Sequence, residues 1–297
     1  MTKTAPLTLY YDTFGQSEHP AVVLIAGLGG HNISWTSEFC QQIADAGFYI
    51  IRPDNRDAGL SPHLDNYPPL NIGEMAERLQ NGEHVDVPYT LFEMANDIIA
   101  LLDALSIEKA HIVGRSMGGM IAQVVASKVA NRTLSLCPIM SSTGNPQLPQ
   151  SEPDVMKMLM SPSVDPKQDF EGYIAGQLAF YRRISSTCVP FDEENCRDYI
   201  TQAFQRNYSP EGTKRQLAAV AVTGDLRPLL GAITAPTLVI HGSVDPLFPV
   251  TSGQDIFDNI ETAKLEVIEG MGHDTPAALN PQIAEMIIEN MRDSEVN

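Results

Sequence analysis

The fold of this chain is decided by the stretch His111-Ile112-Val113-Gly114-Arg115-Ser116-Met117-Gly118-Gly119-Met120. A strand-like apolar run reaches a glycine, a serine follows two residues later, and a helix-like run begins after two more glycines. A serine at such a sharp turn needs a strained backbone, and flanking glycines remove Cβ atoms that would collide with the adjacent strand and helix. In this context Gly-x-Ser-x-Gly is typical of a nucleophilic serine, Ser116. The alternative is a glycine-rich loop that merely packs tightly.

Length and composition indicate a globular protein with an acidic surface. The 297 residues suffice for one large α/β domain or for a core with an insertion, and 43% apolar and 19% charged residues are ordinary for a folded chain. The formal net charge of −18 opposes binding to nucleic acids and anionic membranes. It also disfavours strongly anionic substrates, unless the pocket has a positive field of its own.

The cysteines and the N-terminal residues favour a soluble protein of the cytoplasm. The four cysteines form no Cys-x-x-Cys pair and have no histidine at zinc-ligand spacing, so no metal is expected. Cys188 and Cys196 could pair in an oxidising compartment, but free thiols are the expectation. Residues 1–10 lack the apolar core of a signal peptide, and no segment approaches the length of a membrane span.

Strand-like and helix-like segments alternate over most of the chain. Strands are expected at 7–12, 21–26, 48–52, 111–114, 133–140, 237–242 and 264–269. Helices are expected between them, at 35–46, 90–105, 120–129, 250–260 and 276–291. This alternation predicts a mostly parallel sheet with helices on both faces.

The alternation is interrupted by an all-helical segment. It shows no clear strand and carries helical patterns at 153–160, 170–184, 192–208 and 211–222. We therefore expect an α/β core in two parts, 1–144 and 226–297, separated by a helical cap, 145–225. The acidic cluster Asp192-Glu193-Glu194 is expected to complement the positive end of a cap helix, the alternative being a grip on a substrate amine.

Two residues downstream of Ser116 can complete a hydrolytic triad. A serine nucleophile needs a base, and the base needs an orienting carboxylate. Asp245 follows the strand at 237–242, and His273 follows the next strand, between Gly272 and Asp274. Groups at the carboxyl ends of parallel strands gather at one edge of a sheet, so the order serine, aspartate, histidine predicts a catalytic triad.

Other parts of the site are expected from nearby loops. His241 is the competing base and Asp225 the competing acid. An oxyanion hole needs two converging donors, for which we name the Met117 amide at the helix N-terminus and the Leu28 amide in Gly27-Leu28-Gly29-Gly30. This glycine loop lacks the third glycine of a dinucleotide-binding fingerprint, so no cofactor is expected.

These motifs resemble the α/β-hydrolase superfamily over essentially the whole chain. They are Ala26-Gly27-Leu28-Gly29-Gly30, Asp54-Asn55-Arg56-Asp57-Ala58-Gly59-Leu60-Ser61, Gly114-Arg115-Ser116-Met117-Gly118-Gly119, His241-Gly242-Ser243-Val244-Asp245 and Gly270-Met271-Gly272-His273. The second motif looks most like the carboxylesterase branch that contains aclacinomycin methylesterases. The resemblance implies an eight-stranded sheet with a helical cap, and it assigns Ser116 as nucleophile, His273 as base and Asp245 as its partner. Ala26 replaces the usual histidine, which removes a side-chain brace of the oxyanion loop but leaves the backbone donor.

The sequence thus predicts a serine carboxylic-ester hydrolase that works through an acyl-enzyme without cofactor or metal. C–C bond hydrolysis, cofactor-free perhydrolysis and proline iminopeptidase activity are alternatives for the same triad. A non-catalytic binding protein on this scaffold is an alternative of a different class. The expected partner is a small-molecule ester, not nucleic acid or a membrane, and a homodimer is left open. The pattern assigns no role to Arg115 and no particular ester.

Overall fold

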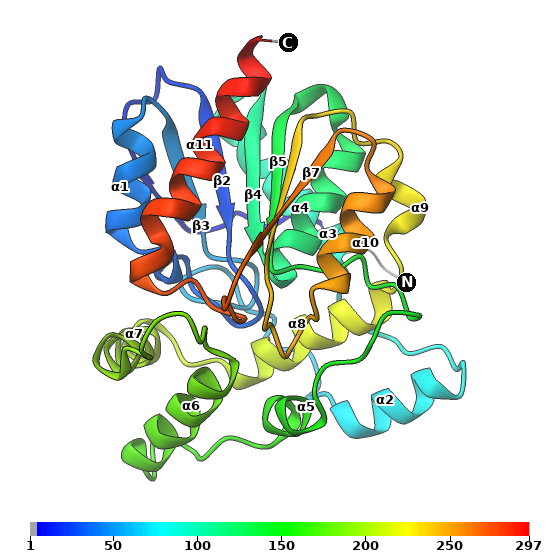
Figure 1. Cartoon of the computed structure of the whole chain (residues 1–297). Coiled ribbons are helices and arrows are strands. Elements are labelled where there is room, and N and C mark those ends of the chain that lie inside the picture. The colour runs from blue at the N-terminus through cyan, green and yellow to red at the C-terminus, as the bar shows by residue number, and fades with distance from the viewer. Residues whose placement is uncertain (1–4, 297) are drawn as a thin grey trace.

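The structure, a computed structural model, describes residues 5–296. Within this range seven strands form one sheet in the order β1-β3-β2-β4-β5-β6-β7 (Figure 1). Neighbouring strands are parallel except β1 and β3, which are antiparallel. The strands are β1 (Tyr11–Phe14), β2 (Ala21–Ile25), β3 (Tyr49–Pro53), β4 (Ala110–Arg115), β5 (Thr133–Ile139), β6 (Thr237–Gly242) and β7 (Ala263–Ile268). The expected mostly parallel α/β sheet is confirmed, with seven strands where the resemblance implied eight.

The N-terminal edge of the sheet begins later than expected. A strand was predicted over 7–12, but pairing starts at Tyr11, opposite Pro53. The Leu7 amide instead donates to Asp97 at 2.7 Å, and the Tyr10 amide donates to the Ser61 hydroxyl at 2.9 Å. Because side chains accept the amide protons of Leu7 and Tyr10, the predicted strand residues before Tyr11 do not form part of β1.

Helices cover both faces of the sheet, and each face has its own apolar core. Helices α1 (Ser37–Asp45) and α11 (Asn280–Val296) pack on one face (Figure 1). The other face carries α3 (Leu91–Ala104), α4 (Met117–Lys128), α9 (Arg227–Leu230) and α10 (Thr251–Asn259). The central strands β2 and β6 are buried along their whole length, as continuous apolar runs predict. No helix within residues 5–296 is long and apolar enough to cross a bilayer.

Of the five helices between β5 and β6, the first four cover the carboxyl ends of the strands. They are α5 (Pro153–Met160), α6 (Phe170–Ile184), α7 (Glu193–Arg206) and α8 (Pro210–Thr223). Helix α2 (Ile72–Gln80) lies beside them (Figure 1). We call these four helices and their connecting segments the cap, and its boundaries as a separate domain, 145–225, stay a prediction. All four cysteines are free thiols.

Candidate active site

Ser116 stands at the sharp turn between β4 and α4. Its backbone has φ 54° and ψ −125°, a region that residues with a side chain rarely adopt. A Cβ atom on Gly114 would lie 2.1 Å from the Gly118 carbonyl oxygen, and one on Gly118 would lie 2.2 Å from the Ile25 carbonyl oxygen. At these distances a Cβ atom would clash with backbone atoms, which cannot move aside as a flexible side chain can. The sequence-based steric role of both glycines is therefore confirmed.

The structure brings Ser116, His273 and Asp245 into one chain of hydrogen bonds. His273 Nε2 lies 2.9 Å from Ser116 Oγ, and His273 Nδ1 lies 2.7 Å from Asp245 Oδ2. Because a carboxylate accepts, Nδ1 carries the ring proton and Nε2 is left to accept from the serine hydroxyl. The other carboxylate oxygen of Asp245 accepts from the Leu247 and Phe248 amides at 2.8 and 2.9 Å. The three side chains thus have the arrangement that activates a serine.

Electrostatics keep Asp245 ionised although it is buried. Burial by itself raises the pKa of this carboxyl, but His273, the nearby His241 and the Phe248 amide together outweigh it and hold the pKa below its ordinary value. An ionised Asp245 can stabilise a positive charge on His273 during a reaction.

The two residues that competed for the roles of base and acid make other hydrogen bonds. His241 is buried beside Asp245, and its Nε2–H donates to the Phe248 carbonyl at 2.8 Å. Burial lowers the pKa of His241, which favours the neutral ring. Asp225 accepts from the Arg227 guanidinium and amide. Within residues 5–296, neither forms a hydrogen bond with Ser116 or His273.

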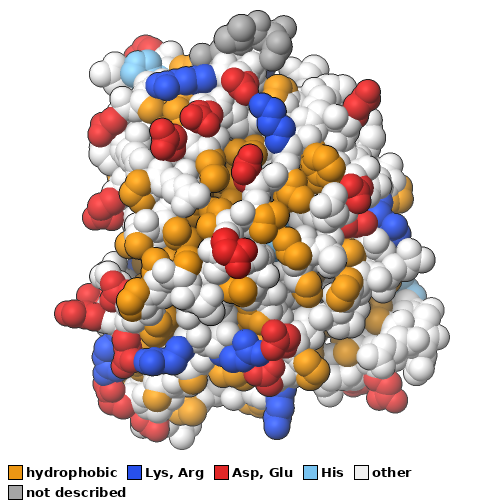
Figure 2. Space-filling model, viewed as in Figure 1, with side chains coloured by type: hydrophobic (Ala, Val, Ile, Leu, Met, Phe, Trp, Pro, Cys, Tyr) orange, Lys and Arg blue, Asp and Glu red, His pale blue; other side chains and the backbone are white. Residues whose placement is uncertain are grey.

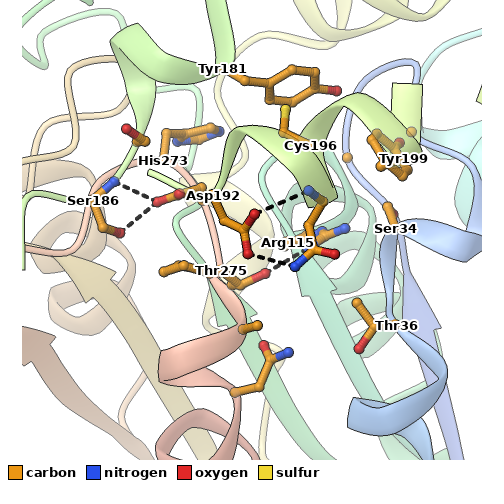
Figure 3. Close-up of a pocket in the computed structure, with 18 of the residues that line it drawn as sticks. Ser34, Thr36, Arg115, Tyr181, Ser186, Asp192, Cys196, Tyr199, His273 and Thr275 are labelled. Carbon is orange, nitrogen blue, oxygen red and sulfur yellow. Dashed lines mark hydrogen bonds between the residues drawn. The ribbon is translucent and has the colours of Figure 1, made fainter. Parts of the chain in front are cut away.

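The His273 loop, residues 270–274, is fastened to the cap. The His273 amide donates to the Ile184 carbonyl at 2.7 Å, and the Gly272 amide donates to Ser186 Oγ at 3.0 Å. Asp274 in turn accepts from the Ser186 amide at 2.8 Å (Figure 3). Sequence analysis did not identify Ser186, because a serine in a loop 87 positions earlier carries no pattern that links it to a histidine.

The glycine loop after β2 lies against the serine. A Cβ atom on Gly27 would be 3.3 Å from Ser116 Cβ. The Gly30 amide donates to the Gly27 carbonyl, and Gly29 has φ 64°, so the loop is a tight turn. Neither the Leu28 nor the Met117 amide donates to a protein acceptor among the described residues. Both amides are therefore available to a ligand beside Ser116.

Buried ion pairs connect the Asp54–Ser61 stretch to its surroundings. They are Asp54–Arg206, Arg56–Asp97 and Asp57–Arg215, with shortest N–O distances of 2.6, 2.6 and 2.7 Å. Since Arg206 ends α7 and Arg215 lies on α8, two of these pairs attach the cap to the core. The stretch that looked most like the carboxylesterase branch therefore has a structural role.

A cavity of about 900 Å³ lies between the core and the cap, in front of Ser116. Its core side includes Ser116, His273 and Arg115, and its cap side includes the aromatic residues Phe180, Tyr181 and Tyr199. These aromatic residues were missed, because their helical spacing is the same as that of core residues. Within the described part of the chain, no three or more His, Cys, Asp or Glu side chains are grouped so that they could hold a metal ion.

The chain is similar to hydrolases over most of its length. A family model described as alpha/beta hydrolase fold matches residues 20–276. A rhodomycin D methylesterase of Streptomyces sp. strain C5 is 26% identical over 98% of this chain and 97% of that protein. A 3-oxoadipate enol-lactonase of Acinetobacter baylyi is 27% identical over 89% of this chain and 85% of that protein. Among solved structures, a 2-hydroxy-6-oxo-6-phenylhexa-2,4-dienoate hydrolase of Rhodococcus sp. strain RHA1 superposes with a TM-score of 0.73, at 21% identity, over 97% of this chain and 96% of its own.

Proposed function

The chain belongs to the α/β-hydrolase family, and from this premise we propose that it is a serine carboxylic-ester hydrolase. The names of its relatives support an ester-type reaction, since one is a methylesterase and another hydrolyses an enol-lactone, which is a cyclic ester. The observation that carries the proposal is the unbroken hydrogen-bond chain from Ser116 through His273 to Asp245.

The first half-reaction forms an acyl-enzyme on Ser116. Its Oγ attacks the ester carbonyl carbon while His273 Nε2 takes the hydroxyl proton, and Asp245 stabilises the resulting imidazolium. The carbonyl oxygen becomes an oxyanion, which accepts hydrogen bonds from the Leu28 and Met117 amides. The tetrahedral intermediate then collapses, and His273 gives its proton to the departing alcohol.

The second half-reaction releases the acid. Water attacks the acyl carbon, with His273 Nε2 again taking a proton, and the same two amides bind the second oxyanion. Collapse of this intermediate returns the proton to Ser116. All proton transfers therefore pass through one nitrogen that already lies 2.9 Å from the serine oxygen.

Iminopeptidase activity is less well supported. Binding a substrate amine would need a free carboxylate from the cluster 192–194, but Asp192 accepts from the Asn195 amide and side chain at 3.1 and 2.6 Å (Figure 3). Glu193 is paired with Arg182 on the surface, and Glu194 is exposed and is not among the residues that line the cavity. Asp192 is thus the N-cap of α7, at the positive end of a cap helix where the sequence analysis expected the acidic cluster.

The proposal extends to the partner and the compartment. We expect a small-molecule ester rather than nucleic acid or a membrane, and the net charge of −18 supports this. We expect the cytoplasm, which the four free cysteines support.

The experiment combines active-site labelling with an ester panel. We expect a fluorophosphonate to label Ser116, and Ser116→Ala to lose both labelling and ester turnover by several orders of magnitude. The matched control is Ser127→Ala, which removes a hydroxyl on the same helix that bonds the Val124 carbonyl. Ester hydrolysis that survives in Ser116→Ala would overturn the assignment. Absence of both labelling and turnover in the wild type would instead favour a non-catalytic binding protein.

A further inference from the structure

Arg115, next to the nucleophile, is a cation without an anionic partner. Its side chain is partly buried and lines the cavity in front of Ser116. One guanidinium N–H donates to Thr275 Oγ1 at 2.8 Å, and the guanidinium carbon lies 4.6 Å from the centre of the Trp35 ring. No Asp or Glu oxygen within the described residues comes within 4.0 Å of it. The remaining N–H groups of its planar fork are therefore free to bind a ligand.

Unlike Arg115, four other arginines whose side chains point inward are paired with aspartates. Each has an aspartate at 2.6 or 2.7 Å, in the pairs Arg52–Asp12, Arg56–Asp97, Arg206–Asp54 and Arg215–Asp57. A chain with 37 acidic residues has no shortage of partners. Removing a guanidinium from water without giving it an anionic partner costs free energy. For the same reason, burial lowers the pKa of Arg115. An anion that arrives with the substrate would remove this cost.

Four acidic residues line the cavity with Arg115, and none of them forms an ion pair with it. Glu38 and Asp198 are exposed, whereas Asp274 and Asp192 are occupied by other donors. Asp274 accepts from both the amide and the hydroxyl of Ser186, and Asp192 accepts from Asn195. The bond between Arg115 and Thr275 can be followed in Figure 3. Arg115 and Thr275 line the same cavity as Ser116 and His273, so a ligand in this cavity can meet both the guanidinium and the reacting groups.

We propose that Arg115 binds a free carboxylate of the substrate, so that the preferred substrates are esters carrying a second, unesterified carboxylate. The inference rests on the proposed ester hydrolysis and names its substrate class. A guanidinium fork can bind a carboxylate with two parallel hydrogen bonds, and a partly buried site strengthens them. The aromatic residues of the cap can contact the carbon chain between the two ends of such a substrate.

This site reconciles an acidic protein with an anionic substrate. The chain carries a net charge of −18, and acidic side chains are scattered over the face shown in Figure 2. Exposed charges are screened by salt beyond about 8–10 Å, whereas a buried guanidinium acts at contact distance. Recognition therefore depends on Arg115, because Arg52, which also lines the cavity, is already paired with Asp12.

The test compares matched esters. Monomethyl esters of linear dicarboxylic acids, from succinate to suberate, are paired with analogues in which an amide replaces the free carboxylate, and methanol release gives kcat/KM. We expect the wild type to prefer the carboxylate ester of the best pair by about 10-fold or more, since charge-assisted hydrogen bonds are strong. In Arg115→Gln this ratio should fall at least 10-fold, and Arg115→Lys should restore part of it. A merely structural role would lower both rates together and leave the ratio unchanged.

The matched control is Arg197→Gln on α7, which removes one positive charge outside the cavity, from an exposed pair with Glu171. We expect its ratio to equal that of the wild type. Equal kcat/KM for carboxylate and amide esters in the wild type, or an unchanged ratio in Arg115→Gln, overturns the inference while ester hydrolysis stands.

A binding readout applies if no ester is turned over. Trp35, the only tryptophan, packs against the guanidinium, so its fluorescence should respond when the free dicarboxylates of the same series bind. We expect saturable changes in the wild type and in Ser116→Ala, and none in Arg115→Gln. Saturation without ester turnover would overturn the proposed function and keep the anion site. No response in any protein, together with no turnover, would overturn both.

Discussion

The Gly29 amide, in the glycine loop after β2, donates a hydrogen bond of 2.8 Å to Oε1 of Gln216 on α8. The amide nitrogen of the same Gln216 donates to the Arg56 carbonyl at 2.7 Å. One fully buried cap side chain thus fixes the turn that carries Leu28. The chain has Ala26 where similar proteins usually have a histidine that braces this loop, and Gln216 braces the loop instead.

Gln216→Ala should therefore weaken oxyanion binding without removing a donor. We expect kcat for a methyl ester to fall about 10-fold, less than the 100-fold or more that follows loss of an oxyanion donor itself. KM should change little, because the loop acts on the transition state. The control is Gln254→Ala on the exposed face of α10, where the side chain bonds only Asp258. An unchanged kcat in Gln216→Ala would show that the loop holds its shape alone.

Gly118→Ala tests the steric explanation of the elbow. The new Cβ would lie 2.2 Å from the Ile25 carbonyl oxygen, so β2 and α4 must move apart. We expect a loss of about 1–3 kcal/mol of unfolding free energy, as overpacking costs, and loss of most ester turnover. Gly176→Ala on α6 is the matched control, since its Cβ meets nothing within 4 Å. That change should stabilise the protein by about 0.5–1 kcal/mol in a urea titration. Equal stability of the two variants would contradict this account.

Asp57→Asn tests the attachment of the cap. It leaves buried Arg215 with only the exposed Asp65, 3.9 Å away, as an acidic partner, which we expect to cost about 3–5 kcal/mol of unfolding free energy. Asp57 has φ 64°, a conformation that asparagine tolerates, so backbone strain does not confuse the result. Asp225→Asn breaks a more exposed pair with Arg227 and should cost less than about 1 kcal/mol. It should also keep full ester activity, and a large loss there would reinstate Asp225 as the acid of the triad.

His111 should make the protein less stable in mild acid. It is fully buried on β4, with Nδ1 2.8 Å from Ser135 Oγ, and burial lowers its pKa from 6.5 to about 4. As the pH falls from 6.5 towards 4, the unfolded chain takes up a proton that the folded chain refuses, so the unfolding free energy decreases. Between pH 7.5 and pH 5 this amounts to about 2 kcal/mol.

In His111→Gln the difference in unfolding free energy between these two pH values should shrink by that amount. His84→Gln, at an exposed site, is the control and should leave the pH dependence as in the wild type. Urea titrations at both pH values give the comparison. An equal pH-dependent loss in His111→Gln and wild type would mean that the ring is hydrated or protonated in the folded state.

The turn at Ser116 and the meeting of Ser116, Asp245 and His273 could be predicted because they follow from local rules. The glycines around Ser116 are dictated by contacts within a few residues, and strand ends place Asp245 and His273 at one edge of the sheet. Gln216 could not be predicted, since it bonds Gly29 across 187 positions and a single glutamine in a helix has no distinguishing pattern.

The pairing of arginines with aspartates could not be predicted from the sequence either. The stretch Asp54–Ser61 was readable as a motif, but which arginine pairs with which aspartate depends on how the cap folds back on the core. A long-range contact also explains the late start of β1, because the Leu7 amide bonds Asp97 on α3, 90 positions away. The sequence assigned no role to Arg115, because the absence of an Asp or Glu partner among the described residues can be seen only in the folded structure.

The bonds from Ile184 and Ser186 to the His273 loop restrict how this protein can be re-engineered. Transplanting a cap from a relative would remove the supports of the proposed base together with the pocket wall. Chimeras should therefore exchange residues 184–188 and 270–274 as one module, whereas substrate range can be altered by single replacements on the inner faces of α6 and α7. The same cap segment lines the pocket and supports the His273 loop, so a transplanted cap has to bring the matching loop with it.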